Sequence, residues 1–359
     1  MSKVTVVFGG QCGSEGKGKF VGYLAKKDNY DVAVNNFYTN AGHTWVDNNG
    51  KPFMIQQIPQ AFVNGETKLY IGAGAGITMT TLLDEIIKFD VANRLFIHPR
   101  AMIILDRHKD AEYTGLTHIS STRKGCGAAQ ADKIMRGANV ILARDVPELE
   151  QYMCQTEIAI NNAIDNNEKV MIEGSQGFDL DINYGNEYPY TTSRQTNVAQ
   201  IVADCGIPVQ AVTEVIAVLR CHPIRVGNQF DDKGKQIGWS GPQGGKELTW
   251  DEITAMSGSP VPLLEKTTVT QKIRRIFEMD WARLSYMSIV NRPTQIALNF
   301  INYVNHADYG VSDYDKLSQE SKNFIERVEL ATGVPVTLIG TGPRDCEIID
   351  LRKHKVIMS

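Results

Sequence analysis

The chain has 359 residues and a formal net charge of −4, and 42% of its residues are hydrophobic. This length can bury one large α/β core or two smaller ones, and the lack of a long basic block argues against non-specific nucleic-acid binding, although not against a nucleotide pocket. The six cysteines form no C-x-x-C pair, which favours reduced thiols in the cytosol. No apolar run approaches the roughly 20 residues of a membrane span, so we expect no signal peptide, no membrane contact and a cytoplasmic location.

The first twenty residues predict a phosphate-binding unit. Residues 4–8 are apolar and β-branched, residues 9–19 hold five glycines and two lysines, and the apolar spacing of residues 20–25 suits a helix. A glycine-rich loop between a strand and a helix turns backbone N–H groups inward and adds the positive end of the helix dipole. A G-x-x-x-x-G-K run ends at Lys19, but Phe20 stands where the Walker pattern has Ser or Thr for magnesium. The loop therefore departs from a conventional P-loop, and a glycine-rich turn with solvated lysines is the alternative.

Strand-like and helix-like segments alternate along the rest of the chain. Strands are predicted at residues 31–34, 68–71, 94–97, 101–105, 169–172, 209–219, 295–301 and 336–339, and helices at 80–89 and 145–168. Residues 72–76 lack the third glycine of a dinucleotide fingerprint and are interpreted as a strand-to-helix turn, and residues 227–247 as a surface excursion. Strands that end in Gly, Ser, Thr or Gln loops favour a parallel sheet with its ligand site at the carboxyl edge. We predict an α/β fold: one large domain over residues 1–359 with a mostly parallel central sheet flanked by helices.

Six segments together resemble the adenylosuccinate synthetase family. They are Gly13–Lys19, Asn40–Thr44, Glu173–Gly177, Tyr188–Ser193, Ile224–Gly227 and Thr341–Pro343, in family order over nearly the whole chain. The resemblance implies a P-loop-NTPase-like central sheet, a homodimer and Mg²⁺ as cofactor. It also implies a ligase reaction in two steps. A nucleoside triphosphate phosphorylates O6 of a 6-oxopurine nucleotide, and the amine of L-aspartate then displaces that phosphate at C6.

The resemblance assigns roles to individual residues. Lys17 and the loop amides would stabilise the charge of the transferring phosphoryl group. His43 resembles the catalytic histidine at that phosphoryl, and Gln176 resembles the side chain that contacts the purine O6. Arg136 resembles the arginine that reaches the 5′-phosphate from the neighbouring subunit. Two of these residues have a plainer alternative: His43 as a structural histidine, and Arg136 as a solvated charge in a basic loop.

The implied binding sets are larger. The purine nucleotide would contact Ser14, Asn40, Ser121, Thr122, Arg136, Gln176, Thr192, Val226 and Lys272. The donor nucleotide would contact Gly13, Glu15, Gly16, Lys17, Gly18, Gly42, His43, Thr44, Arg274, Asn299, Asn302, Gly340, Thr341 and Gly342. L-Aspartate would contact Thr268, Val269, Thr270 and Arg274, and Mg²⁺ would be held by Ser14 and the Gly42 carbonyl.

Ser14 departs from the family, which has a catalytic aspartate at this position that removes the purine N1 proton and ligates Mg²⁺. Serine is no strong base near neutral pH, so one interpretation is a homologue that has lost activity. The intact lysines, His43 and Gln176 speak against that. A changed substrate is the other interpretation, because guanine carries a 2-amino group beside N1 and a hydroxyl is small, neutral and able both to donate and to accept. The replacement resembles the phage branch of the family, and this resemblance implies dGMP as substrate and a 2-aminoadenine DNA precursor as product. The acceptor of the N1 proton, and a role of Ser14 as Mg²⁺ ligand or as partner of the base, stay open.

A second departure concerns the phosphate donor. The family has Thr-Lys-Leu-Asp near the end of a strand, and its aspartate reads the guanine of GTP. Here the corresponding run is residues 299–302, and Asn302 presents an acceptor and two donors that can pair with adenine. Phe300 offers a stacking face. We expect ATP or dATP as donor, with a register slip or a plain strand-end asparagine as the alternative.

The third departure lies in the aspartate-binding loop, where the family has Thr-Thr-Gly followed by arginines. The corresponding run here is residues 269–275. Arg274 would hold the substrate carboxylate, for which a forked guanidinium is suited, and Lys272 replaces an arginine that reaches the nucleotide sugar. Two alternatives to a dGMP ligase remain: an ordinary adenylosuccinate synthetase that uses IMP and GTP, and a non-catalytic nucleotide-binding protein.

Overall fold

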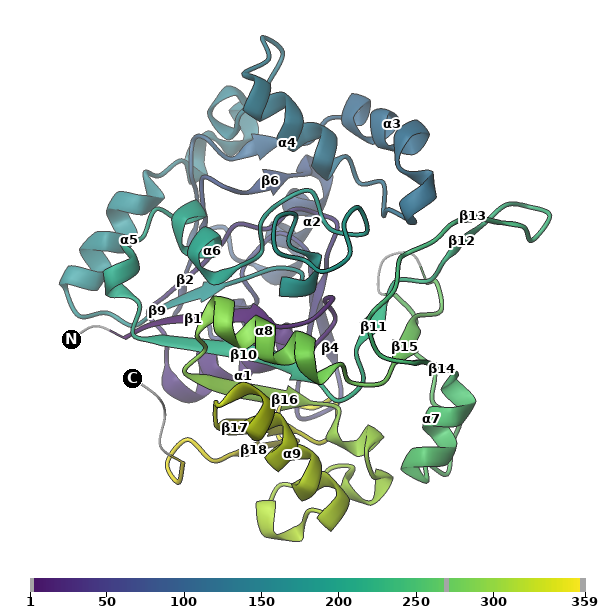
Figure 1. Cartoon of the computed structure of the whole chain (residues 1–359). Coiled ribbons are helices and arrows are strands. Elements are labelled where there is room, and N and C mark those ends of the chain that lie inside the picture. The colour runs from purple at the N-terminus through teal and green to yellow at the C-terminus, as the bar shows by residue number, and fades with distance from the viewer. Residues whose placement is uncertain (1–2, 268–270, 356–359) are drawn as a thin grey trace.

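A mostly parallel sheet forms the centre of the molecule (Figure 1). The computed structural model describes residues 3–267 and 271–355, apart from the side chain of Thr114. Within these residues nine strands follow the order β18-β17-β16-β10-β1-β9-β2-β5-β7, and only the β17–β18 pair is antiparallel. The strands of this sheet are β1 (Val4–Gly9), β2 (Val32–Asn35), β5 (Lys68–Ile71), β7 (Leu95–Ile97), β9 (Val170–Glu173), β10 (Glu214–Arg220), β16 (Gln295–Asn299), β17 (Val336–Gly340) and β18 (Ile348–Asp350).

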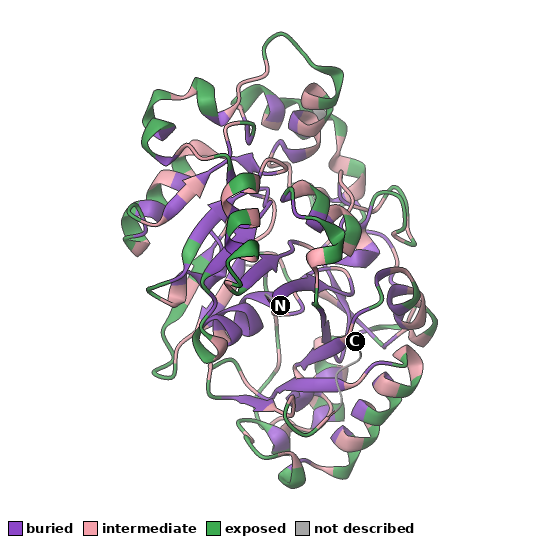
Figure 2. Cartoon of the chain, turned by 90° about the vertical axis from the view of Figure 1, so that its left-hand side faces the viewer, coloured by how far each residue is buried: buried purple, intermediate pink, exposed green. Residues whose placement is uncertain are grey.

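Helices cover both faces of the sheet. They are α1 (Lys17–Asp28), α2 (Met79–Phe89), α3 (Asp106–Gly115), α4 (Cys126–Met135), α5 (Thr156–Asp165), α6 (Val198–Asp204), α7 (Trp250–Ser257), α8 (Trp281–Asn291) and α9 (Gln319–Thr332). Alternate residues of a strand point to opposite faces, so β1 feeds two separate cores. Val6 and Phe8 pack in the core that α5, α6, α8 and α9 close, whereas Val7 packs in the core under α1 and α2. Both cores are buried while the outer faces of the helices are exposed (Figure 2).

The remaining strands are short and lie outside the central sheet. They are β3 (His43–Val46), β4 (Pro52–Ile55), β6 (Gly76–Ile77), β8 (Met102–Ile103), β11 (Ile224–Arg225), β12 (Gln229–Phe230), β13 (Gln236–Gly238), β14 (Glu247–Leu248) and β15 (Arg275–Phe277). The hairpin of β12 and β13 projects from the body, which confirms the surface excursion for that part of residues 227–247, whereas Ser240 and Gln243 further along are buried (Figure 1).

Four predicted elements differ from the structure. The strand expected over 101–105 is reduced to the two-residue β8, which pairs with β6 outside the central sheet. The strand expected over 209–219 begins only at Glu214, because residues 209–211 form a 3₁₀ turn before pairing with β1 starts. The strand expected over 295–301 ends at Asn299, since Phe300 adopts a positive φ of 62° that no strand continues. The helix expected over 145–168 is broken into a 3₁₀ segment, residues 147–152, and the shorter α5.

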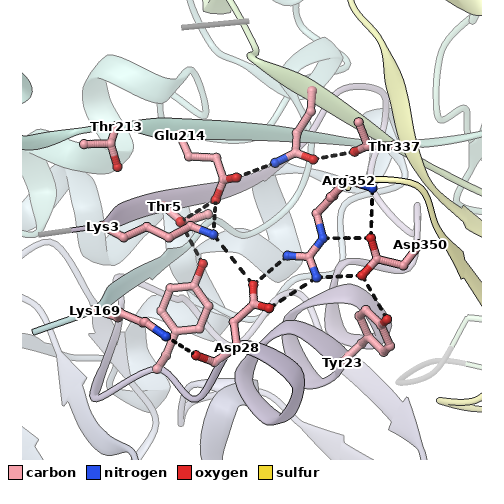
Figure 3. Close-up of polar contacts among 12 residues, drawn as sticks. Lys3, Thr5, Tyr23, Asp28, Lys169, Thr213, Glu214, Thr337, Asp350 and Arg352 are labelled. Carbon is pink, nitrogen blue, oxygen red and sulfur yellow. Dashed lines mark hydrogen bonds and ion pairs between the residues drawn. The ribbon is translucent and has the colours of Figure 1, made fainter. Parts of the chain in front are cut away.

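A polar network closes the amino-terminal edge of the sheet (Figure 3). The Thr5 hydroxyl donates to Glu214, Glu214 accepts from the Gln295 amide, and Thr337 donates to Gln295, so neighbouring strands are linked in a row. Arg352, just beyond β18, pairs with Asp28 and Asp350 in the same region. The loops that hold the predicted site residues lie at the opposite, carboxyl edge of the sheet, where parallel sheets bind ligands.

Candidate active site

A cavity of about 760 Å³ lies at the carboxyl edge of the sheet. Its wall includes most of the residues predicted for the site: Gly13, Ser14, Gly16, Lys17, Gly18, Asn40, Gly42, His43, Thr44, Ser121, Thr122, Gln176, Thr192, Val226, Lys272 and Arg274. These residues come from segments far apart in the sequence, and the parallel strands bring them together because their carboxyl ends share one edge. The volume is at the upper end of the range for small-molecule pockets, which fits several substrates bound together.

The glycine-rich loop curls around its own carboxylate. One oxygen of the fully buried Glu15 accepts hydrogen bonds from the backbone N–H groups of Gln11 and Gly13 at 3.2 and 2.7 Å. The other lies 2.8 Å from the Lys17 Nζ, which also donates to the Gln176 carbonyl. This arrangement fixes the loop and holds the lysine charge at the cavity wall.

Gly16 shows why the loop needs glycine. Its φ is 91°, and a Cβ there would come within 2.2 Å of the Asn299 Nδ2. That amide donates to the Glu15 carbonyl at 3.1 Å. Asn299, predicted as a donor-nucleotide contact, thus supports the loop from behind and is not part of the cavity wall.

His43 opens β3 and lies against a buried carboxylate. Its Nδ1 is 2.6 Å from Glu173 Oε1, and the two side chains are 7% and 0% exposed. The other Glu173 oxygen accepts from the Gln60 N–H at 2.7 Å, so the carboxylate is held in place. A carboxylate only accepts, which assigns the imidazole proton to Nδ1 and leaves Nε2 for a ligand. This is the arrangement of a histidine prepared for acid–base work.

Gln176 and Asn40 each present a buried oxygen with no hydrogen-bond partner among the described residues. The Gln176 amide nitrogen donates to the Thr192 hydroxyl at 2.8 Å, which orients the side chain. Both residues line the cavity. A buried polar atom without a partner is costly, so these two oxygens indicate where ligand donors bind.

Ser14 is bound by two arginines. It has a φ of 58°, its carbonyl accepts from Arg220 at 3.1 Å, and its hydroxyl oxygen accepts from Arg274. Both guanidinium groups pair with Glu265. Burial lowers the pKa of Arg274 to about 10, which leaves the group positively charged near neutral pH.

Several predicted residues lie outside the cavity wall. Besides Asn299, these are Glu15, Arg136, Asn302, Gly340, Thr341 and Gly342. Asn302 is buried in the 3₁₀ turn after β16, and Arg136 is exposed at the end of α4. The predicted aspartate contacts Thr268, Val269 and Thr270 lie outside the described residues.

Three side chains at the site were not predicted from the sequence to be functional: Glu173, Glu265 and Arg220. Glu173 is the last residue of the buried strand β9 and the first of the Glu173–Gly177 motif, so a carboxylate at a strand end was the available signal. Arg220 is likewise a charge that ends an apolar strand and is completely buried. Nothing local in the sequence marks Glu265, because its partners are 45 and 9 residues away.

Three further observations concern membrane-spanning helices, metal ligands and cysteines. None of the helices described is long and apolar enough to cross a membrane. No group of three or more His, Cys, Asp or Glu side chains placed to hold a metal occurs among the described residues. The six cysteines, which all lie among the described residues, are free. Burial raises the pKa of Cys12 in the glycine-rich loop to about 12, so this residue stays a thiol.

The sequence profile of the adenylosuccinate synthetase family matches residues 6–146 and 140–309. Among relatives, the adenylosuccinate synthetase of Archaeoglobus fulgidus is 38% identical over 98% of this chain and 99% of its own length. That of Pyrococcus horikoshii is 38% identical over 97% of this chain and 98% of its own.

Solved structures agree with this assignment. The Cyanophage S-2L succinoaminodeoxyadenylate synthetase (PurZ), bound to dGMP and to dATP as an energy donor, is 27% identical with a TM-score of 0.83, covering 98% of this chain and 96% of that one. The fully ligated adenylosuccinate synthetase of Plasmodium falciparum has a TM-score of 0.84 at 20% identity, covers 97% of this chain and 100% of that chain, and bears on the fold alone. From the profile match, the identity to curated relatives over almost the full chain and the shared fold, the chain belongs to the adenylosuccinate synthetase family of carbon–nitrogen ligases.

Proposed function

We propose that the enzyme condenses dGMP with L-aspartate, driven by ATP or dATP. In the first step O6 of the purine attacks the γ-phosphoryl group, the nucleoside diphosphate leaves, and the N1 proton is lost. In the second step the aspartate amine attacks C6, phosphate leaves, and the amine loses a proton. The product is 2-amino-2′-deoxy-N6-succinyladenylate, a precursor of 2-aminoadenine DNA.

One observation carries the choice of dGMP: a hydroxyl, Ser14, in place of the family's aspartate. Its side chain faces the same cavity as His43 and Gln176, so the substitution falls among the reacting groups. A neutral hydroxyl at this point accommodates the guanine 2-amino group without a fixed carboxylate beside it. The PurZ structure with dGMP and dATP supports the same choice.

The chain's own residues supply the rest of the reaction. Lys17 and the loop amides stabilise the negative charge of the moving phosphoryl group. His43, with its Nε2 left for the ligand, protonates or deprotonates at the transferring group. One N–H of the Gln176 amide binds Thr192, and the second donates to O6 and orients it. Arg274 draws the anionic substrates into the cavity. The 5′-phosphate of dGMP binds at the hydroxyls of Ser121, Thr122 and Thr192, with Asn40 and Lys272 also on the nucleotide.

Of the two predicted Mg²⁺ ligands, the Gly42 carbonyl suits the ion better than Ser14 does. Magnesium takes few protein oxygens and completes its shell with phosphates and water. The Gly42 carbonyl is such an oxygen at the cavity wall. The Ser14 oxygen already accepts from Arg274, whose positive charge opposes a second cation. We therefore expect Gly42 and the nucleotide phosphates to hold the ion, which would offset phosphate charge during transfer.

A homodimer in which Arg136 reaches the partner's cavity is part of the proposal. Arg136 ends α4 and is exposed, outside the wall of its own cavity. Beside it Ile134 and Met135 are 66% and 77% exposed. Large exposed apolar side chains, next to an arginine that does not line its own cavity, favour a protein partner at this end of α4.

The second candidate is the ordinary reaction with IMP and GTP, which the 38% identity to archaeal adenylosuccinate synthetases favours. One assay separates the two: phosphate release with L-aspartate, crossing dGMP or IMP with ATP, dATP or GTP. We expect turnover with dGMP and an adenine nucleotide. Turnover with IMP and GTP alone would refute the proposal.

Substitution at position 14 tests the residue that carries the proposal. Ser14→Asp should reduce dGMP use relative to IMP, and Cys12→Ser, a change two residues away on the same cavity wall, is the matched control. Unchanged use of dGMP by the Ser14→Asp protein would show that Ser14 does not set the substrate.

A further inference from the structure

The two arginines that hold Ser14 share one carboxylate. Arg220 Nη1 and Nη2 lie 3.1 and 2.5 Å from the two oxygens of Glu265 in a forked pair. Arg274 Nε lies 3.8 Å from one of the same oxygens. The Arg220 side chain is fully buried, and those of Glu265 and Arg274 are 16% and 11% exposed. Such a cluster is costly to desolvate, and it lies directly behind a residue that lines the cavity.

Glu265 is what allows the two guanidinium groups to approach each other. Burial alone would raise its pKa, but Arg220, Arg274 and a hydrogen bond from Tyr303 hold the pKa below its usual value. The Arg220 Cζ lies 4.2 Å from the centre of the Phe300 ring, which fixes it from the other side. Without the carboxylate the like charges of the arginines would repel each other in a poorly solvated place.

The contact between Arg274 and Ser14 has a fixed direction. A guanidinium group has N–H donors and no acceptor, so the Ser14 oxygen must accept this hydrogen bond. The hydroxyl proton of Ser14 then points to some other acceptor, and the side of the residue that remains is the cavity. To act as a base, the neutral hydroxyl would have to accept a proton and gain positive charge, which the neighbouring guanidinium opposes.

We propose that Glu265 is a positioning residue that fixes Arg274 on the Ser14 oxygen and so makes the Ser14 hydroxyl a hydrogen-bond donor to an acceptor of the bound purine. The donor would stabilise the negative charge that the ring gains as its N1 proton leaves. Ser14 is then neither the base nor a Mg²⁺ ligand. The inference rests on the proposed function only in that a 6-oxopurine nucleotide occupies the cavity.

A double-mutant cycle tests the coupling. Ser14→Ala, Glu265→Gln and the double variant are compared with wild type for the dissociation constant of dGMP and of IMP, measured by calorimetry with EDTA present. Each single change should weaken binding of the purine that the enzyme uses by about tenfold, the effect of one hydrogen bond to a charged or polarised group. The double variant should bind no more weakly than Ser14→Ala, because Glu265 acts through Ser14. Additive losses would overturn the proposal.

Glu247→Gln is the matched control, because Glu247 makes a forked pair with Arg275, next in sequence to Arg274, but lies outside the cavity wall. It should leave nucleotide binding unchanged, and an equal loss there would mean that any broken pair in this region weakens binding. If Glu265→Gln does not fold, Glu265→Asp, which keeps the charge but shortens the reach, replaces it in the cycle.

A magnesium titration separates the donor role of Ser14 from a role as Mg²⁺ ligand. With the donor role, Ser14→Ala lowers the rate but leaves the Mg²⁺ concentration for half-maximal phosphate release unchanged. An increase of about tenfold or more would assign Ser14 to the metal and contradict the inference. If wild type binds IMP and not dGMP, the proposed substrate is wrong, but the cycle is still measured with IMP and decides the role of Glu265 by itself.

Discussion

Glu173→Gln is expected to lower kcat strongly with little effect on folding. The carboxylate accepts from His43 Nδ1 at 2.6 Å with both side chains buried, and this contact selects the tautomer that leaves Nε2 free for the ligand. An amide at the same place can donate to Nδ1 and reverse the tautomer. A hydrogen bond to a charged group contributes about 1.5–3 kcal/mol, which predicts a fall in kcat of roughly 10- to 150-fold.

The assay is steady-state phosphate release with saturating nucleotides and L-aspartate, together with a thermal melt. Glu85→Gln is the matched control, because the buried Glu85 also holds a loop by accepting from backbone N–H groups, at residues 56–58, but does not line the cavity. It should lose stability and keep its kcat. A Glu173→Gln enzyme with kcat within twofold of wild type, or a kcat loss equal to that of the control, would refute the reasoning about His43.

Three further changes have defined outcomes. Asn302→Asp should shift the ratio of kcat/KM for GTP over ATP upward by about tenfold, because a carboxylate accepts from guanine N1–H and its amino group; an unchanged ratio would mean that Asn302 does not read the donor base. Burial lowers the pKa of His222 to about 4 in the folded protein, so between about pH 6.5 and pH 4 the unfolded chain binds more protons than the folded one. The free energy of unfolding therefore falls as the pH drops through this range. Urea denaturation of His222→Gln should show a shallower dependence of this free energy on pH. Arg352→Ala leaves Asp28 and Asp350 without their shared cation and should lower the free energy of unfolding by about 1–3 kcal/mol, whereas a loss under about 0.5 kcal/mol would contradict the role given to this pair.

The sequence predicted the fold class because its strands are marked twice, by β-branched apolar runs and by the glycine and polar loops that follow them. Strand bounds were less certain where an apolar run continues past its pairing partner. The run 209–219 has Val or Ala on both sides of Glu214, yet pairing begins only where Glu214 meets Thr5. At the end of β16 the change to a left-handed backbone at Phe300 has no local signal, because phenylalanine rarely adopts it.

The sequence predicted the site residues that lie within motifs better than the residues that contact them from other segments. Residues within most motifs, such as Lys17 and His43, line one cavity, because these motifs lie in loops at the carboxyl edge of the same parallel sheet, whereas Thr341 and Gly342 stay outside its wall. Side chains that act on those residues from other segments were missed. Glu173 was noted only as the first residue of the Glu173–Gly177 motif, without a role of its own. Glu265 meets its partners only through the tertiary fold, as is usual for side-chain networks.

The register of the two central strands explains how position 14 came to depend on residues so distant in sequence. β1 and β10 pair in parallel, with Gly9 opposite Val218, so the loop after β1 leaves the sheet beside the last residue of β10, Arg220. That residue donates to the Ser14 carbonyl and thereby fixes the backbone at its positive φ. A substitution at position 14 therefore changes the side chain at the cavity wall while the backbone that carries it is held from the sheet. On the proposed function, the loop keeps the shape that Glu15 and the glycines maintain while the residue at position 14 changes the base that the enzyme accepts.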